Sequence, residues 1–126
     1  LEEEGVLIMF PSGEISTAKK IKLKAVEKEW KQYVAKLSLK WQSPVLPIFF
    51  EGQNSSVFQL ANKIGQTFRY SVMMYELRKK MGTNINVHIG SLIKYNKIKT
   101  IGELKEITNY LRKETYKLDP ENFSYY

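Results

Sequence analysis

Two short runs of apolar residues place the tightest limit on how this chain can fold. The first is residues 6–11, "VLIMFP", which follows Gly5, and the second is residues 44–50, "PVLPIFF", which leads to Gly52. Apolar runs of this length between turn residues are typical of strands that a sheet buries on both faces. A helix that spans a membrane needs about 20 consecutive apolar residues, so the sequence predicts no membrane-spanning segment.

A helical pattern lies between the two runs. From residue 27 onward, apolar side chains recur at spacings of four, three and four, which places them on one face of a helix. The helix should end near Ser43, because Pro44 disfavours helical geometry in the residue before it. The apolar residues with this spacing are Trp30, Val34, Leu37 and Trp41.

Two further helices are predicted in the middle of the chain. Residues 55–65 start at Ser55 or Ser56, either of which can cap a helix, and stop at Gly65. Residues 70–82 end in basic residues and a glycine, as helix C-termini prefer. This second helix has basic residues on both sides of an apolar and aromatic centre, a composition that also suits a membrane interface.

A strand and a helix complete the chain. Residues 84–90 alternate apolar and polar side chains, as a half-exposed strand does, and His88 belongs to the exposed, polar set. The apolar set is Ile85, Val87 and Ile89. Residues 98–118 predict a closing helix, with Thr100 and Glu103 in capping-box spacing. The element order β-α-β-α-α-β-α predicts one α/β domain, with a parallel or mixed sheet flanked by helices.

The chain carries a surplus of positive charge. Twenty Lys and Arg residues against 13 Asp and Glu residues give a formal net charge of +7, which favours anionic partners. The sequence has no helix-turn-helix spacing, zinc-finger ligand set or aromatic RNA-binding signature, so nucleic acid is not predicted as the partner. The absence of cysteine excludes a disulfide scaffold, a thiolate metal site and a cysteine nucleophile.

Small and polar residues follow each of the two predicted buried strands. They form residues 12–17, "SGEIST", and residues 51–56, "EGQNSS". Ligands of α/β sheets gather at loops beyond the carboxyl ends of strands, so these loops predict a shared binding crevice. The alternative is that Gly13 and Gly52 are ordinary turn residues and that the polar side chains cap nearby backbone groups.

Several blocks in a fixed order give the sequence a family resemblance. The chain resembles the C-terminal half of a lysophospholipid acyltransferase domain, in the bacterial hemolysin-like branch of the phospholipid/glycerol acyltransferases. The blocks are "FPSGEIS" at residues 10–16, "KEWKQYVAKLSLKWQSPVLPIFFEGQNSSVFQL" at residues 28–60 and "FRYSVMMYELRKKMGTNINVHIGSLI" at residues 68–93. The resemblance implies an acyltransferase-like half over residues 1–93, and the helix over residues 98–118 would close the domain.

The first block departs from the wider family. Where that family has Phe-Pro-Glu-Gly-Thr-Arg, this chain has Ser12, Glu14 and Ile15 in place of Glu, Thr and Arg. The missing arginine is the side chain suited to bidentate phosphate recognition. A small residue before the glycine and an acid after it resemble the hemolysin-like branch, which implies a different acceptor.

The family's catalytic signature is His-x-x-x-x-Asp, in which the histidine is the general base and the aspartate orients it. His88 is the only histidine here, and Ile93 stands five positions after it. The resemblance therefore implies no catalytic residue in this chain, an upstream signature, and an inactive fragment when the 126 residues stand alone. Residues 1–5, "LEEEG", lack the basic start and apolar middle of a secretory signal.

The resemblance also implies a reaction and a location. The reaction would move a fatty acyl group from acyl-CoA or acyl carrier protein to the hydroxyl of a lyso-lipid, with no metal or bound cofactor. The protein would lie peripherally on the cytoplasmic side of the inner membrane and would not be secreted. A fragment of this kind can be held together as a homodimer. The alternative function is a non-catalytic basic module that docks on an anionic membrane or protein partner.

Two sets of residues follow as candidates for the site. The acceptor-binding candidates are Ser12, Gly13, Glu14, Ser16, Asn54 and Ser55. The candidates for contact with donor or membrane phosphates are Lys19, Lys20, Lys22 and Lys24. For these lysines a solvated loop, or an edge strand protected by charge, is the alternative interpretation.

Overall fold

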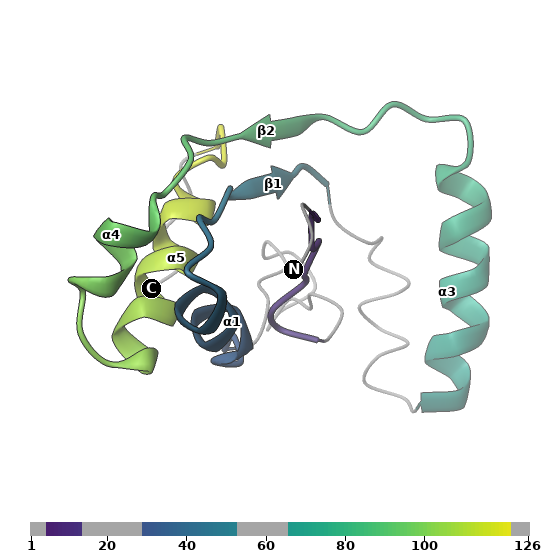
Figure 1. Cartoon of the computed structure of the whole chain (residues 1–126). Coiled ribbons are helices and arrows are strands. Elements are labelled where there is room, and N and C mark those ends of the chain that lie inside the picture. The colour runs from purple at the N-terminus through teal and green to yellow at the C-terminus, as the bar shows by residue number, and fades with distance from the viewer. Residues whose placement is uncertain (1–4, 14–28, 53–65, 122–126) are drawn as a thin grey trace. The chain divides into compact units, whose positions relative to one another are not determined.

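The computed structural model describes residues 5–13, 29–52 and 66–121, except for the side chains of residues 66–71 (Figure 1). These residues divide into two compact units. The first comprises residues 5–13, 29–49 and 87–121, and the second comprises residues 50–52 and 66–86. The elements are α1 (Tyr33–Trp41), β1 (Ile48–Phe50), α3 (Gln66–Lys80), β2 (Val87–Ile89), α4 (Tyr95–Lys99) and α5 (Leu104–Tyr116).

The core of the first unit lies where α1 meets α4 and α5 (Figure 1). Its fully buried residues are apolar and come from three helices and the segment after β2. They are Ala35, Ile93, Ile98, Ile107 and Leu111. Half-buried apolar side chains pack around them, and these are Trp30, Val34, Leu39, Val45, Ile101, Leu104 and Tyr110. Burial of such side chains is the main source of stability that the described residues offer.

The helix predicted from residue 27 begins at Tyr33, and a different face of it is buried. Ala35 and Ser38 are the buried residues of α1, whereas Leu37 and Trp41 are only half-buried. The small Ala35 side chain is fully enclosed, which lets α1 approach α4 and α5 closely. The helix ends as predicted before Pro44, at a left-handed Gln42 with φ of 49°.

The single helix predicted over residues 98–118 is two helices. α4 closes at Thr100, whose hydroxyl donates to the Lys97 carbonyl at 2.9 Å. Gly102 then turns the chain with φ of +129°. The capping box is formed by Glu103 and Glu106, not by Thr100 and Glu103, and the Glu103 N–H donates to Glu106 Oε2 at 3.0 Å. The prediction was wrong here because Thr100 is occupied at the end of α4.

β1 and β2 form a two-stranded antiparallel sheet, and the described residues show no parallel pair. Val45 pairs with Ile93 through two backbone hydrogen bonds, and the Gly90 N–H donates to the Pro47 carbonyl at 2.9 Å. Between these two pairings, the segment that leads into β1 has one residue, Leu46, and the segment that follows β2 has two, residues 91–92. The additional residue after β2 forms a β-bulge, a feature that bends a strand and redirects its side chains.

The predicted burial of the 84–90 strand is wrong. Ile85, Val87 and Ile89 are exposed, at 59%, 43% and 66%, and His88 is half-buried. The His88 ring packs at 6.5 Å from the Phe49 ring, centroid to centroid. The reason is that β1 presents Phe49 on its half-buried face, so the strand turns its histidine toward this ring.

The buried strand predicted over residues 6–11 is not present. Residues 5–10 have no regular structure, and Val6 and Ile8 are 94% and 77% exposed. β1 pairs with β2 instead, and the described residues contain no strand that pairs with this segment. The strand predicted in residues 44–50 does form as β1, but Ile48 and Phe50 are exposed rather than buried.

The second unit contains α3, which confirms the helix predicted over residues 70–82. It ends in three basic residues, and Gly82 follows it with φ of +79°. The Lys80 carbonyl near the end of α3 accepts hydrogen bonds from the Thr83 hydroxyl at 2.8 Å and from the Thr83 N–H at 3.1 Å. None of the described helices is both long and apolar enough to cross a membrane. The helix predicted over residues 55–65 lies outside the described residues.

Candidate functional site

The first block of the family resemblance forms a tight turn in the first unit. The Gly13 N–H donates to the Phe10 carbonyl at 3.0 Å, and Gly13 has φ of +64°, which glycine adopts without strain. Ser12 is buried, at 2% exposed. The Pro11 carbonyl accepts a hydrogen bond from the Lys31 N–H at 3.0 Å, which ties the turn to the segment before α1.

A cation lies against this turn. A side chain added at Gly13 would place its Cβ 3.5 Å from Lys31 Nζ, so the ammonium group sits beside the glycine backbone. The position of Lys31 was not predicted from the sequence. It depends on the hydrogen bond between the Lys31 N–H and the Pro11 carbonyl, and these two residues lie far apart in the sequence. The turn thus combines a glycine, a buried hydroxyl residue and a positive charge.

Only part of the predicted acceptor site can be located. Ser12 and Gly13 are in the turn, and the remaining candidates lie outside the described residues. These are Glu14, Ser16, Asn54 and Ser55, together with Lys19, Lys20, Lys22 and Lys24. The second loop is visible at its start, where Asn86 Nδ2 donates to Glu51 Oε2 at 2.9 Å and Gly52 has φ of +108°. The crevice between the two loops stays a prediction.

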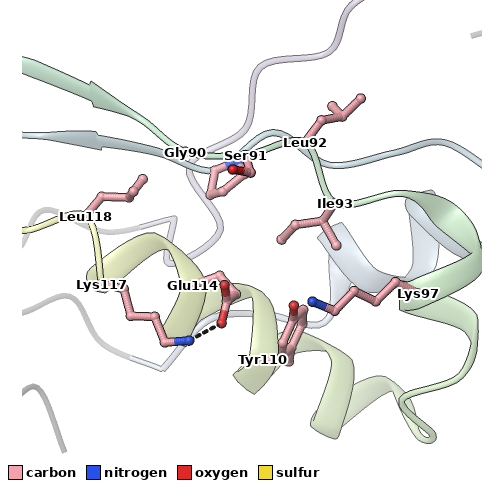
Figure 2. Close-up of a pocket in the computed structure, with 10 residues that line it drawn as sticks. Gly90, Ser91, Leu92, Ile93, Lys97, Tyr110, Glu114, Lys117 and Leu118 are labelled. Atoms are coloured by element: carbon pink, nitrogen blue, oxygen red, sulfur yellow. Dashed lines mark hydrogen bonds and ion pairs between the residues drawn. The ribbon is translucent and has the colours of Figure 1, made fainter.

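A second site, which the sequence did not reveal, lies at the bulge between β1 and β2. It is an open pocket of about 300 Å³, lined entirely by residues of the first unit. One wall is formed by Pro47 and by residues 90–93 (Figure 2). The other wall comes from α4, α5 and the turn after α5, through Lys97, Tyr110, Glu114, Lys117 and Leu118. We refer to it as the bulge pocket.

Charged groups gather on one side of the bulge pocket. Lys117 Nζ and Glu114 Oε1 form an ion pair at 2.5 Å, and this carboxylate raises the pKa of Lys117 above its ordinary value of 10.5. Lys97 Nζ lies 5.2 Å from the centre of the Tyr110 ring. The Tyr110 hydroxyl raises the pKa of Lys97, and Glu114 also favours its charged form.

The Tyr110 hydroxyl is a polar group of the pocket that is buried without a hydrogen bond. It is buried and has no hydrogen-bond partner among the described residues. It lies near enough to Lys97 to favour the charged ammonium, and Figure 2 shows the two groups side by side, but they do not meet the geometry of a hydrogen bond. A buried hydroxyl without a partner costs about 1–3 kcal/mol.

Part of this pocket has a signal in the sequence. Tyr110, Glu114 and Lys117 are spaced by four and three residues, the spacing that puts side chains on one helix face. The wall from residues 90–93 has no such signal, because the bulge depends on how β1 and β2 pair. Lys97 was missed because it lies just before the predicted helix of residues 98–118, whereas in the structure it belongs to α4.

Comparison with known proteins identifies the family of the chain. Searches of curated proteins and of solved structures each found no match. The sequence model of a family described as "Acyltransferase" matches residues 1–122. This match covers nearly all of the 126 residues, including the Phe10–Gly13 turn and the bulge pocket. The chain therefore belongs to this acyltransferase family.

Proposed function

We propose that this chain is part of an enzyme that moves a fatty acyl group from an acyl-CoA or acyl carrier protein thioester to the hydroxyl of a lyso-lipid. The observation that carries the proposal is the acyltransferase family match over residues 1–122. In the reaction, the acceptor oxygen bonds to the thioester carbonyl carbon, the thiol leaves, and a general base takes the hydroxyl proton. The thioester is a cosubstrate, and the proposal includes no metal or bound cofactor.

The proposal assigns the general base to another part of the full-length protein. A general base must reach the proton that it removes. The only histidine of the chain is His88, which is half-buried in β2 and packs against Phe49. This packing supports a structural role for His88. We expect a His-x-x-x-x-Asp motif elsewhere in the full-length protein, in keeping with the family resemblance of the hemolysin-like branch.

The turn at residues 10–13 is proposed to bind the acceptor. Lys31 gives the turn a positive charge beside Gly13, and a positive charge attracts the phosphate of a lipid headgroup. The acceptor residues proposed with Ser12 and Gly13 are Glu14, Ser16, Asn54 and Ser55. The lysines at positions 19, 20, 22 and 24 are proposed to contact donor or membrane phosphates, at about 1 kcal/mol for each lysine near an anionic surface.

The first prediction tests acyl transfer and the role of the turn together. The full-length protein would be incubated with radiolabelled acyl-CoA or acyl carrier protein and a panel of lyso-lipids. We expect label on one class of lyso-lipid. Substitution Glu14→Gln should lower kcat/KM about 10–100-fold, since a hydrogen bond to a charged group is worth about 1.5–3 kcal/mol.

The matched control is Glu29→Gln, which removes the same charge from an exposed residue outside the turn and should leave transfer unchanged. A lack of transfer with either donor, together with retained binding to anionic liposomes, would contradict the proposal and favour a membrane-docking module. Transfer by the 126-residue chain alone would instead show that the catalytic group lies within it.

A further inference from the structure

We propose that the bulge pocket binds the phosphate group of a small phosphate ester, with Lys97, Lys117 and Tyr110 as the binding residues. The pocket lies at the β1–β2 bulge and α5, and it contains none of the candidate acceptor residues of the turn. The inference does not depend on acyl transfer, because binding can be measured without turnover. Its chemistry follows from charge, an unpartnered hydroxyl and an apolar wall.

The charge of the pocket favours an anion. Its lining has two lysines and one glutamate, Glu114, so the formal sum is +2 − 1 = +1. The two ammonium groups repel each other, because the Lys97 charge lowers the pKa of Lys117 whereas Glu114 raises it. Glu114 already pairs with Lys117, which leaves Lys97 as the less neutralised cation. Like charges held close together are stabilised by an anion placed between them.

The Tyr110 hydroxyl supplies a donor that the protein itself does not use. It is buried without a partner among the described residues, and it lies beside Lys97 in Figure 2. A phosphate oxygen that reaches both groups would accept one hydrogen bond from the hydroxyl and one from the ammonium. A buried donor gains most from a ligand that satisfies it, because its desolvation has already occurred in the free protein.

The opposite wall favours an ester over free phosphate. The wall opposite the charged groups includes Pro47, Leu92 and Ile93, and Leu118 adds apolar surface beside Lys117. Inorganic phosphate has no apolar group to place there. The volume of about 300 Å³ is at the lower end for small-molecule sites. A phosphate joined to a short carbon chain, either in solution or as a lipid headgroup, matches both walls.

The test is a calorimetric titration of the full chain with glycerol 3-phosphate. Glycerol and inorganic phosphate serve as controls for the two halves of the ligand. A separate arm measures binding to phosphatidylcholine vesicles with and without lysophosphatidic acid, which distinguishes a lipid headgroup from a soluble ester. We expect glycerol 3-phosphate or the lysophosphatidic acid vesicles to bind more tightly than the controls.

Matched variants connect this binding to the pocket. Lys97→Gln and Lys117→Gln should each raise the Kd about tenfold or more, the effect expected for a lost hydrogen bond between charged groups. Lys99→Gln on α4 and Lys113→Gln on α5 remove the same charge from exposed residues that do not line the pocket, and they should leave the Kd unchanged. Equal effects of the test and control variants would overturn the proposal.

The substitution Tyr110→Phe separates ligand binding from a structural role. If the hydroxyl serves a ligand, this variant weakens binding and does not lower the Tm of the ligand-free chain, because no internal hydrogen bond is lost. A lower Tm with an unchanged Kd would overturn the assignment of Tyr110. Absence of binding to glycerol 3-phosphate and to the vesicles would overturn the whole inference, whatever the result of the acyl-transfer assay.

Discussion

At the scale of single residues, Gly90 is a position where a side chain would meet residues that are distant in the sequence. A Cβ there would lie 2.9 Å from Pro47 Cγ and 3.2–3.3 Å from the two terminal methyl groups of Leu118. The Gly90 N–H also holds the Pro47 carbonyl at 2.9 Å. This glycine is therefore needed for a close approach between β1, the bulge and the turn after α5.

The substitution Gly90→Ala should lower the stability of the chain. The added methyl group must displace Pro47 or Leu118, and overpacking of this kind costs about 1–3 kcal/mol in free energy of unfolding. Chemical denaturation would measure it. Ser91→Ala is the matched control, because Ser91 is the exposed neighbour and surface changes stay within about 0.5 kcal/mol. Equal stability of the two variants would mean that Leu118 moves aside without cost.

Two glycines show which structural roles of single residues can be predicted from the sequence and which cannot. Gly13 was predictable, because a glycine after Pro and Ser suits a turn, and its φ of +64° fits that role. Gly90 was not, because its contacts come from Pro47 and Leu118, which are distant in the sequence. The Tyr110 hydroxyl, which has no partner among the described residues, was not predictable either, since no local pattern shows whether a hydroxyl will find a partner.

At the scale of elements, periodicity located helices better than it located their faces. α3 overlaps the predicted segment 70–82, and β2 lies inside the predicted segment 84–90. In β2, however, His88 is half-buried, and Val87 and Ile89 are exposed. A period fixes which residues share a face, and the partner decides which face is buried. For β2 that partner is Phe49, and for α1 the partners are α4 and α5.

The end of α5 gives a prediction on pH. The ion pair with Glu114 raises the pKa of Lys117 above 10.5. A raised lysine pKa adds stability that is fully present below 10.5 and is lost as the pH rises through the folded-state value. We therefore expect the difference in Tm between wild type and Lys117→Gln to be constant from neutral pH to about 9.5 and to shrink above 10.5.

The control for this pH effect is Lys113→Gln, which changes an exposed lysine of the same helix. The two variants differ only in which lysine is replaced, so the comparison between them isolates the effect of Lys117. A Tm difference that stays the same above pH 10.5 would show that Lys117 contributes through packing rather than through its charge.

At the scale of the whole molecule, the buried apolar residues that the structure describes gather in one of the two units. All five residues of the described core belong to the first unit, and three of them lie on α4 and α5. The sequence predicted helices and strands for an α/β domain, and the described residues do combine helices with a small antiparallel sheet. It could not predict this arrangement, because the core depends on α1 packing against α5.

This distribution of the core predicts that apolar truncations destabilise the chain more in the first unit than in the second. Ile107 is fully buried in the first unit, and Ile85 is 59% exposed in the second. Replacing Ile107 with alanine should lower the free energy of unfolding by about 2–5 kcal/mol, because it removes buried methyl groups and leaves a cavity. Ile85→Ala makes the same chemical change at an exposed site and should cost about 0.5 kcal/mol or less. Equal losses in urea denaturation would place the stabilising core outside the contacts of α1, α4 and α5.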